Sequence, residues 1–139
     1  MKRKLCFFLA LTLSLTFVLS GCKGNPLPDG MDEDAVVSAG LSVMNELVGG
    51  EYDAVYAALR EDVRAKTSTD AIREMMETAA DGLGNYRKVT DTMATGVTKE
   101  GIEPHGIAVI RAKYDKKSIY FRIAFDTELE LIGLEIKRK

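Results

Sequence analysis

Three successive segments carry apolar residues at intervals of three and four positions, the spacing that places them on one face of a helix. We expect helices over residues 32–48, 52–64 and 68–82. The glycine pair after residue 48 stops the first helix, and Ser68 is a favourable N-cap for the third. The apolar positions of the three helices are Val36, Val37, Leu41, Met44, Leu47, Val48, Tyr52, Val55, Tyr56, Leu59, Val63, Ile72, Met75, Met76 and Ala79.

After Gly84 the apolar residues alternate with polar or small ones, which is typical of strands. Residues 86–95 form a weak, polar strand that we expect at an edge of the sheet. Three stronger strands follow, at residues 106–114, 119–125 and 132–137. Helices therefore come first and strands second.

The alternation also predicts a register. If Asp115 and Lys116 form a two-residue turn, Ile110 lies opposite Phe121. A four-residue turn at the next connection places Phe125 opposite Ile132. One face of the sheet is then wholly apolar, and the helices must cover it. We expect an α+β domain in which three N-terminal helices pack on one face of a curved, four-stranded antiparallel sheet.

Residues 1–21 have the layout of a cleaved secretory signal, with three basic residues followed by an apolar run of about 15 residues, too short to span a bilayer. The run ends in Leu19-Ser20-Gly21-Cys22, which resembles the lipobox of bacterial lipoprotein precursors. The resemblance implies a diacylglyceryl group on Cys22 and a location on the extracytoplasmic face of the cell membrane. The alternative is an ordinary signal that leaves Cys22 as an unpaired thiol.

Residues 22–30 contain two prolines and two glycines without periodicity, and we interpret them as a lipid-anchored tether to a single domain over residues 31–139. After removal of the signal, 16 basic and 21 acidic residues remain, so the net charge is −5. This balance disfavours a nucleic-acid-binding protein. Cys6 leaves with the signal, so Cys22 has no disulfide partner.

Three short motifs resemble a family of Gram-positive lipoproteins that carry a domain of unknown function. They are the helix junction at residues 47–55, Gly84-Asn85-Tyr86 at the entry to the sheet, and the ending at residues 133–136. The resemblance implies the nuclear transport factor 2-like fold, a cystatin-like cone. It brings no catalytic residues.

Candidate catalytic groups are few. His105 is the chain's single histidine, and the predicted register places it opposite Asp126. This pair could provide acid-base chemistry of the isomerase or dehydratase kind, although a loop histidine without catalytic use is the simpler interpretation. We expect no cofactor or metal, because the acidic cluster at residues 29–34 lacks the ligand spacing of a calcium loop.

The face of the sheet away from the helices is a candidate interface. Its register places Arg122 opposite Glu135, and Tyr120 between Arg111 and Lys137. Ile107, Val109 and Tyr120 give this face more apolar area than a face exposed only to solvent usually has. The candidate interface residues are Val109, Arg111, Tyr120, Arg122 and Glu135, and the candidate partners are a second copy of the chain or an unknown surface protein. The simpler interpretation is a solvated face that carries a cross-strand ion pair.

A pocket between helices and sheet is the other candidate site, because the mature chain has few large aromatic residues to fill its core. Tyr52, Tyr56, Tyr86 and His105 are its candidate lining residues for a small ligand. The alternative is that the tyrosines close the rim of the core. The leading hypothesis is a membrane-anchored, non-catalytic binding domain; the alternatives are a small enzyme and a structural accessory domain.

Overall fold

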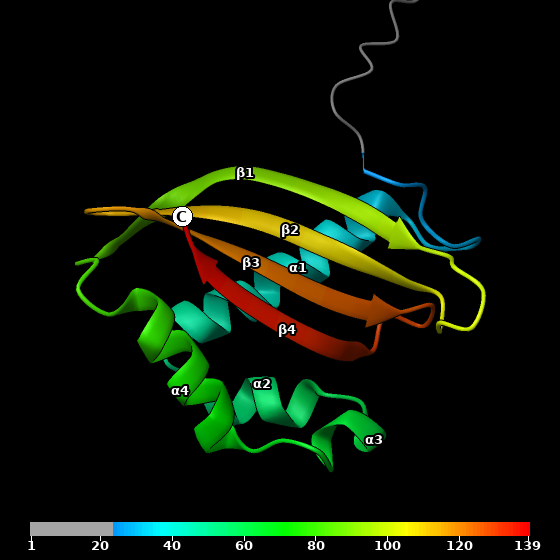
Figure 1. Cartoon of the computed structure of the whole chain (residues 1–139), viewed down its shortest axis with the longest axis horizontal. Coiled ribbons are helices and arrows are strands. Elements are labelled where there is room, and N and C mark those ends of the chain that lie inside the picture. Colours follow the sequence, from blue (N-terminus) through cyan, green and yellow to red (C-terminus); the bar gives the residue numbers. More distant parts are fainter. Residues whose placement is uncertain (1–23) are drawn as a thin grey trace, which may run out of the picture.

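The computed structural model describes residues 24–139, so the predicted signal and Cys22 lie outside the described residues. Helices come first and cover one side of a single antiparallel sheet (Figure 1). The predicted α+β class is therefore confirmed. The elements are α1 (Glu33–Val48), α2 (Tyr52–Ala58), α3 (Glu61–Arg64), α4 (Thr69–Ala80), β1 (Tyr86–Val97), β2 (His105–Tyr114), β3 (Ser118–Asp126) and β4 (Leu131–Arg138).

Side-chain caps start the two long helices. The carboxylate of Asp32 accepts a hydrogen bond of 3.0 Å from the amide of Ala35 at the start of α1. The hydroxyl of Ser68 accepts one of 3.1 Å from the amide of Ala71 at the start of α4, as predicted. Each bond satisfies an amide that has no partner within its helix.

The single helix predicted over residues 52–64 is wrong, because the chain leaves helical geometry at Leu59 (φ −62°, ψ 139°). Leu59 forms a parallel bridge with Leu131 at the start of β4, and the amide of Arg60 donates to the carbonyl of Leu131 at 2.8 Å. The bridge pairs backbone groups at the edge strand, so α2 and α3 are separate helices.

The sheet has the order β1-β2-β3-β4, and its central register is as predicted, with Ile110 opposite Phe121. The predicted pairing of Phe125 with Ile132 is wrong: Phe125 lies opposite Leu131. The amide of Asp126 donates to the carbonyl of Glu130, and this bond starts the pairing one residue early. A bulge beside Phe125 restores the predicted register further along β4.

Side chains fill the space between α1 and the sheet. From α1, Met44 and Leu47 are at most 1% exposed, and they meet Ile110 and Phe121, which are fully buried in the sheet. Gly40 lets α1 approach the sheet closely, because a Cβ at this position would overlap the Cβ of Ala108. The space between α1 and the middle of the sheet is therefore occupied by the protein's own core.

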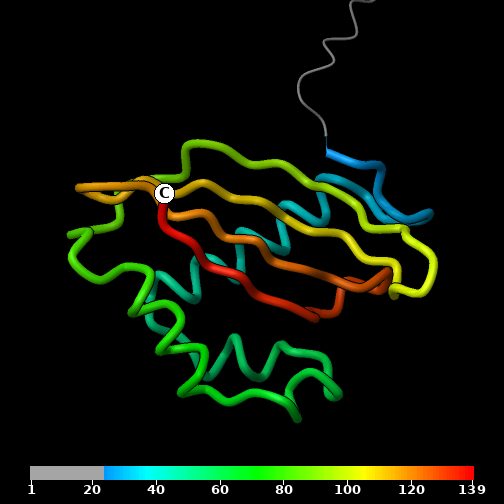
Figure 2. Tube along the Cα trace, viewed as in Figure 1, coloured from blue at the N-terminus to red at the C-terminus, as the bar shows by residue number. Residues whose placement is uncertain are grey.

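Residues 24–30, predicted as a tether, lie against the end of β1 instead (Figure 2). The amide of Asn25 donates to the hydroxyl of Thr95 at 3.0 Å, and its carbonyl accepts from the amide of Gly96 at 2.9 Å. Leu27 packs on the core and Pro28 is buried. Gly96 permits this contact, since a Cβ there would lie 2.7 Å from the Cα of Leu27.

Candidate functional site

The face of β2, β3 and β4 that the helices leave uncovered is centred on Tyr120. We call the five predicted residues there, Val109, Arg111, Tyr120, Arg122 and Glu135, the open face. In the sheet register Tyr120 lies between Arg111 and Lys137, as predicted. The guanidinium carbon of Arg111 lies 5.8 Å from the centre of the Tyr120 ring, and the ammonium nitrogen of Lys139 lies 6.0 Å from it. Both cations are thus within reach of the aromatic ring.

The predicted cross-strand pair of Arg122 and Glu135 forms, with 3.3 Å between Nε and Oε2. Glu135 also lies 2.6 Å from the ammonium group of Lys137, which together with Arg122 holds the pKa of Glu135 below its usual value. All three side chains are exposed, so these ion pairs add little to stability. Their effect is to arrange charge around Tyr120.

A hollow of about 330 Å³ lies over Tyr120 on the open face. Val109 and Tyr120 supply its apolar floor, and basic side chains form its rim. The full set of lining residues is Val109, Tyr120, Arg122, Lys137, Arg138 and Lys139.

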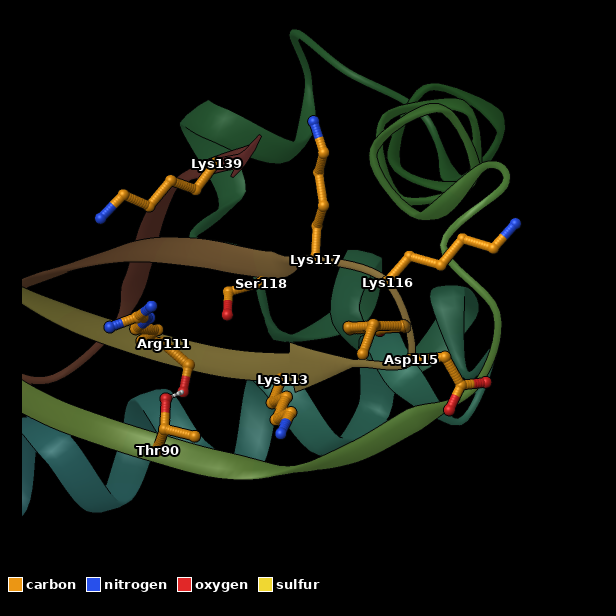
Figure 3. A pocket seen from close by; sticks show the side chains of 9 residues that line it. Thr90, Arg111, Lys113, Asp115, Lys116, Lys117, Ser118 and Lys139 are labelled. Carbon is orange, nitrogen blue, oxygen red and sulfur yellow. Dashed lines mark hydrogen bonds between the residues drawn. The ribbon is translucent and has the colours of Figure 1, made fainter.

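A second hollow, of about 450 Å³, adjoins the first at Lys139 and extends to the turn between β2 and β3 (Figure 3). We call it the basic hollow. Its only acidic lining residue, Asp115, accepts a 2.7 Å hydrogen bond from the amide of Asn85 and pairs with Arg87. These two contacts hold the pKa of Asp115 below its usual value. The lining residues are Thr90, Arg111, Lys113, Tyr114, Asp115, Lys116, Lys117, Ser118 and Lys139.

Arg111 joins the two surfaces. Its Nε is buried and has no hydrogen-bond acceptor within the described residues. Beside it, Thr90 is a bulge residue of β1, and its hydroxyl donates to the carbonyl of Arg111 at 3.2 Å. Bulges frequently redirect a strand next to a functional site. The charged head of Arg111 thus lies at the border of the open face and the basic hollow (Figure 3).

Sequence reasoning identified Arg111 but missed the lysines of the basic hollow. Lys116 and Lys117 lie in the connection between β2 and β3, Lys113 comes from β2, and Lys139 follows β4. The repeated lysines at residues 113–117 and 137–139 were the available signal, because the predicted register already placed these segments at one end of the sheet.

His105 and Asp126 are cross-strand neighbours, as the predicted register required. Their side chains, however, contact other groups. Nδ1 of His105 lies 2.7 Å from the carbonyl oxygen of Glu103. The carboxylate of Asp126 accepts hydrogen bonds from the amides of Glu128 and Glu130, both at 2.9 Å, and from Arg60 at 3.0 Å.

Asp126 is buried at 7% exposure, and burial alone would raise the pKa of its carboxyl group. The two turn amides and the Arg60 guanidinium outweigh this effect and lower the pKa. Arg60 in turn binds Asp62 and Glu103, at 2.7 Å each. The carboxylate therefore closes a turn and binds an arginine, and neither contact prepares it to act as a base toward His105.

Of the four residues predicted to line a pocket, His105 lies at the opposite end of β1 from Tyr86. Tyr86 lies opposite Tyr114 at one end of β1, with ring centres 5.8 Å apart, whereas His105 lies opposite Val97 at the other end. Burial raises the pKa of Tyr114 to about 12. On the helices, Tyr52 lies under the guanidinium of Arg73 at 5.5 Å. Tyr52, Tyr56 and Tyr86 all pack against the rim of the core.

Within residues 24–139, no group of three or more histidine, cysteine or acidic side chains is arranged to hold a metal ion. No helix in this part of the chain is long and apolar enough to cross a bilayer.

Comparisons with known proteins agree with this fold. An NMR structure of a protein from Ruminococcus gnavus ATCC 29149 is similar, with a TM-score of 0.67 and 15% sequence identity over 80% of this chain and 96% of that chain. At this identity the likeness extends to the fold alone.

No curated protein matches the chain. The family model described as "Protein of unknown function (DUF3887)" matches residues 41–134, from the middle of α1 into β4. Since this match spans more than half of the sequence, the chain belongs to the DUF3887 family.

Proposed function

We propose that this chain is a lipoprotein of a Gram-positive bacterium, anchored through Cys22 on the extracytoplasmic face of the cell membrane, and that its domain is a non-catalytic binding module with the nuclear transport factor 2-like cone fold. The basic start, apolar run and lipobox support the location. The observation that carries the binding role is the open face, where the half-buried Tyr120 lies among cations and none of the helices within residues 24–139 covers it.

The docked N-terminal segment limits how far the domain could lie from a lipid on Cys22. Gly24 lies beside Thr95, so only residue 23 separates the docked chain from Cys22. Two Cα steps span about 8 Å. A lipid on Cys22 would therefore hold this end of the sheet close to the headgroups, rather than let the domain move on a long tether.

The composition of the open face favours binding over solvation. Tyrosine and arginine are enriched in protein interfaces, and a hollow with an apolar floor and a charged rim also suits a small amphipathic ligand. We propose no catalytic step, since His105 and Asp126 each contact groups other than one another.

The anchor is tested by expressing the full chain and its Cys22→Ser variant in a Gram-positive host and separating the extracts into detergent and aqueous phases. We expect the unchanged chain in the detergent phase and the variant in the aqueous phase or the medium. An unchanged chain that is cleaved and found in the aqueous phase would contradict the anchor.

The open face is tested by light scattering on a soluble form comprising residues 24–139. If the face binds a second copy, the unchanged protein has the mass of a dimer and Tyr120→Glu has the mass of a monomer. Met75→Glu is the matched control, since Met75 is 37% exposed on α4 and is expected to leave the mass unchanged. A monomer in all three samples would exclude self-association through this face.

A further inference from the structure

The basic hollow holds an excess of unpaired positive charge. Five of its lining residues are basic, and none of the five forms an ion pair with another described residue. Asp115, its one acidic residue, is already engaged by Arg87 and the amide of Asn85. The five are Arg111, Lys113, Lys116, Lys117 and Lys139.

This cluster stands out because the mature chain is acidic overall, with 16 basic and 21 acidic residues after position 21. Acidic residues gather at the opposite end of the sheet, where α1 begins and where Val97, His105 and Asp126 lie side by side across three strands. The acidic residues at that end are Asp29, Asp32, Glu33, Asp34, Glu100, Glu103, Asp126, Glu128 and Glu130. Positive charge is therefore concentrated at one end rather than spread over the surface.

The donors in the basic hollow match one kind of ligand. Arg111 is packed beside Tyr120, and its buried Nε lacks an acceptor. The lysines add mobile positive charges, and Ser118 adds a hydroxyl group on the same surface (Figure 3). An arginine fork beside lysines and hydroxyl groups suits the several oxygens of a phosphate better than a single carboxylate.

We propose that the basic hollow binds a phosphate-bearing ligand, with Arg111 and Lys113 as its main contacts. The proposal rests on the proposed binding role of the domain and names the chemical class of its ligand. The volume of about 450 Å³ is that of a small-molecule site. The phosphate belongs either to a free ligand or to a lipid headgroup.

The test titrates pyrophosphate into the soluble protein of residues 24–139, which holds all the packing contacts described above, and follows amide NMR shifts at about 150 mM salt. We expect saturable shifts at residues 111–118. Binding should be about tenfold weaker in Arg111→Gln and in Lys113→Gln, because each variant loses a hydrogen bond from a charged group. Lys113 is exposed, so its variant tests the site without disturbing the core.

Lys99→Gln is the matched control, because Lys99 is exposed beyond the far end of β1 and its replacement removes the same charge. Equal weakening by this control would overturn the proposal in favour of general electrostatic attraction. Binding of succinate as tight as that of pyrophosphate would overturn the assignment to phosphate.

A second arm uses sedimentation with phosphatidylglycerol vesicles and, as the neutral reference, phosphatidylcholine vesicles. Arg111-dependent binding to the anionic vesicles alone identifies a headgroup, whereas binding of pyrophosphate alone identifies a free ligand. Binding of neither would refute the phosphate site, and it would leave the anchor and the Tyr120 surface to their own tests.

Discussion

At the scale of single residues, Gly40 determines how closely α1 approaches the sheet. It lies in the middle of a helix, where glycine is unfavourable by up to about 1 kcal/mol relative to alanine. It is nevertheless buried against Ala108, a rigid residue of β2 that is fully buried itself. Here the demand for space at the helix-sheet contact outweighs helix propensity.

We therefore expect Gly40→Ala to lower the free energy of unfolding by about 1–2 kcal/mol, because the overlap with Ala108 costs more than the gain in helix propensity. Urea denaturation measures the change. Ser38→Ala, on the exposed side of the same helix, is the control and should have no such cost. A Gly40→Ala variant more stable than the unchanged protein would show that α1 has room to move.

A second residue-scale prediction concerns Tyr114, which is 4% exposed and packs edge-on against Tyr86. Because burial raises its pKa to about 12, Tyr114 is expected to ionise at a higher pH than an ordinary tyrosine, which ionises near pH 10. In a pH titration, the ultraviolet absorbance of tyrosinate should rise in a separate step at high pH, and Tyr114→Phe should remove this step. Since the folded state keeps this proton longer, stability should fall as the pH rises from about 10 to 12.

At the scale of elements, the Arg60 cluster joins the helices to the sheet. Arg60 follows the Leu59 bridge to β4 and binds Asp62, Glu103 and Asp126, and these carboxylates raise the pKa of Arg60 above its usual value. Asp62 and Arg60 flank the start of α3, Glu103 precedes β2, and Asp126 ends β3. One guanidinium thus connects three parts of the chain.

The lowered pKa of Asp126 predicts a pH dependence of folding. A carboxyl group with a lower pKa in the folded state adds stability above its unfolded pKa of about 3.9, and that stability is lost as the pH falls through the folded value. Urea denaturation from pH 7 to pH 2 should therefore show a smaller acid loss in Asp126→Asn than in the unchanged protein. At pH 7 the variant should be less stable by about 1–2 kcal/mol. Parallel curves for the two proteins would contradict this role.

At the scale of the whole molecule, the N-terminal segment is part of the domain. Leu27 packs on the core, and its side chain lies against Gly106. We expect residues 31–139 alone to be less stable than residues 24–139 by about 1–3 kcal/mol, the value of burying one large apolar side chain. Urea denaturation of the two forms, with Leu27→Ala in the longer one, measures this loss. Equal stability of all three would mean that residues 24–30 act as a free tether.

Much of the fold could be predicted because it depends on local periodicity. Alternation with period two, together with a two-residue turn at Asp115 and Lys116, leaves one register that buries all the large side chains on one face. The same reasoning located Tyr120 between Arg111 and Lys137. It failed at Leu59 and at Ile132, where backbone bonds to distant residues override a local pattern that continues unbroken.

The amino-acid sequence by itself determined that helices precede strands, the central register and the face of the sheet that carries Tyr120, because each follows from the identity and spacing of near neighbours. The lipid anchor, which lies outside the described residues, stays a prediction. Only the tertiary structure decided that α1 packs directly on the sheet, that residues 24–30 dock on β1, and that Arg111 and the lysines of β2, the turn and the chain end surround one hollow. These features depend on how side chains from separate elements pack together, and the spacing of residues along the chain does not give the distances between such side chains.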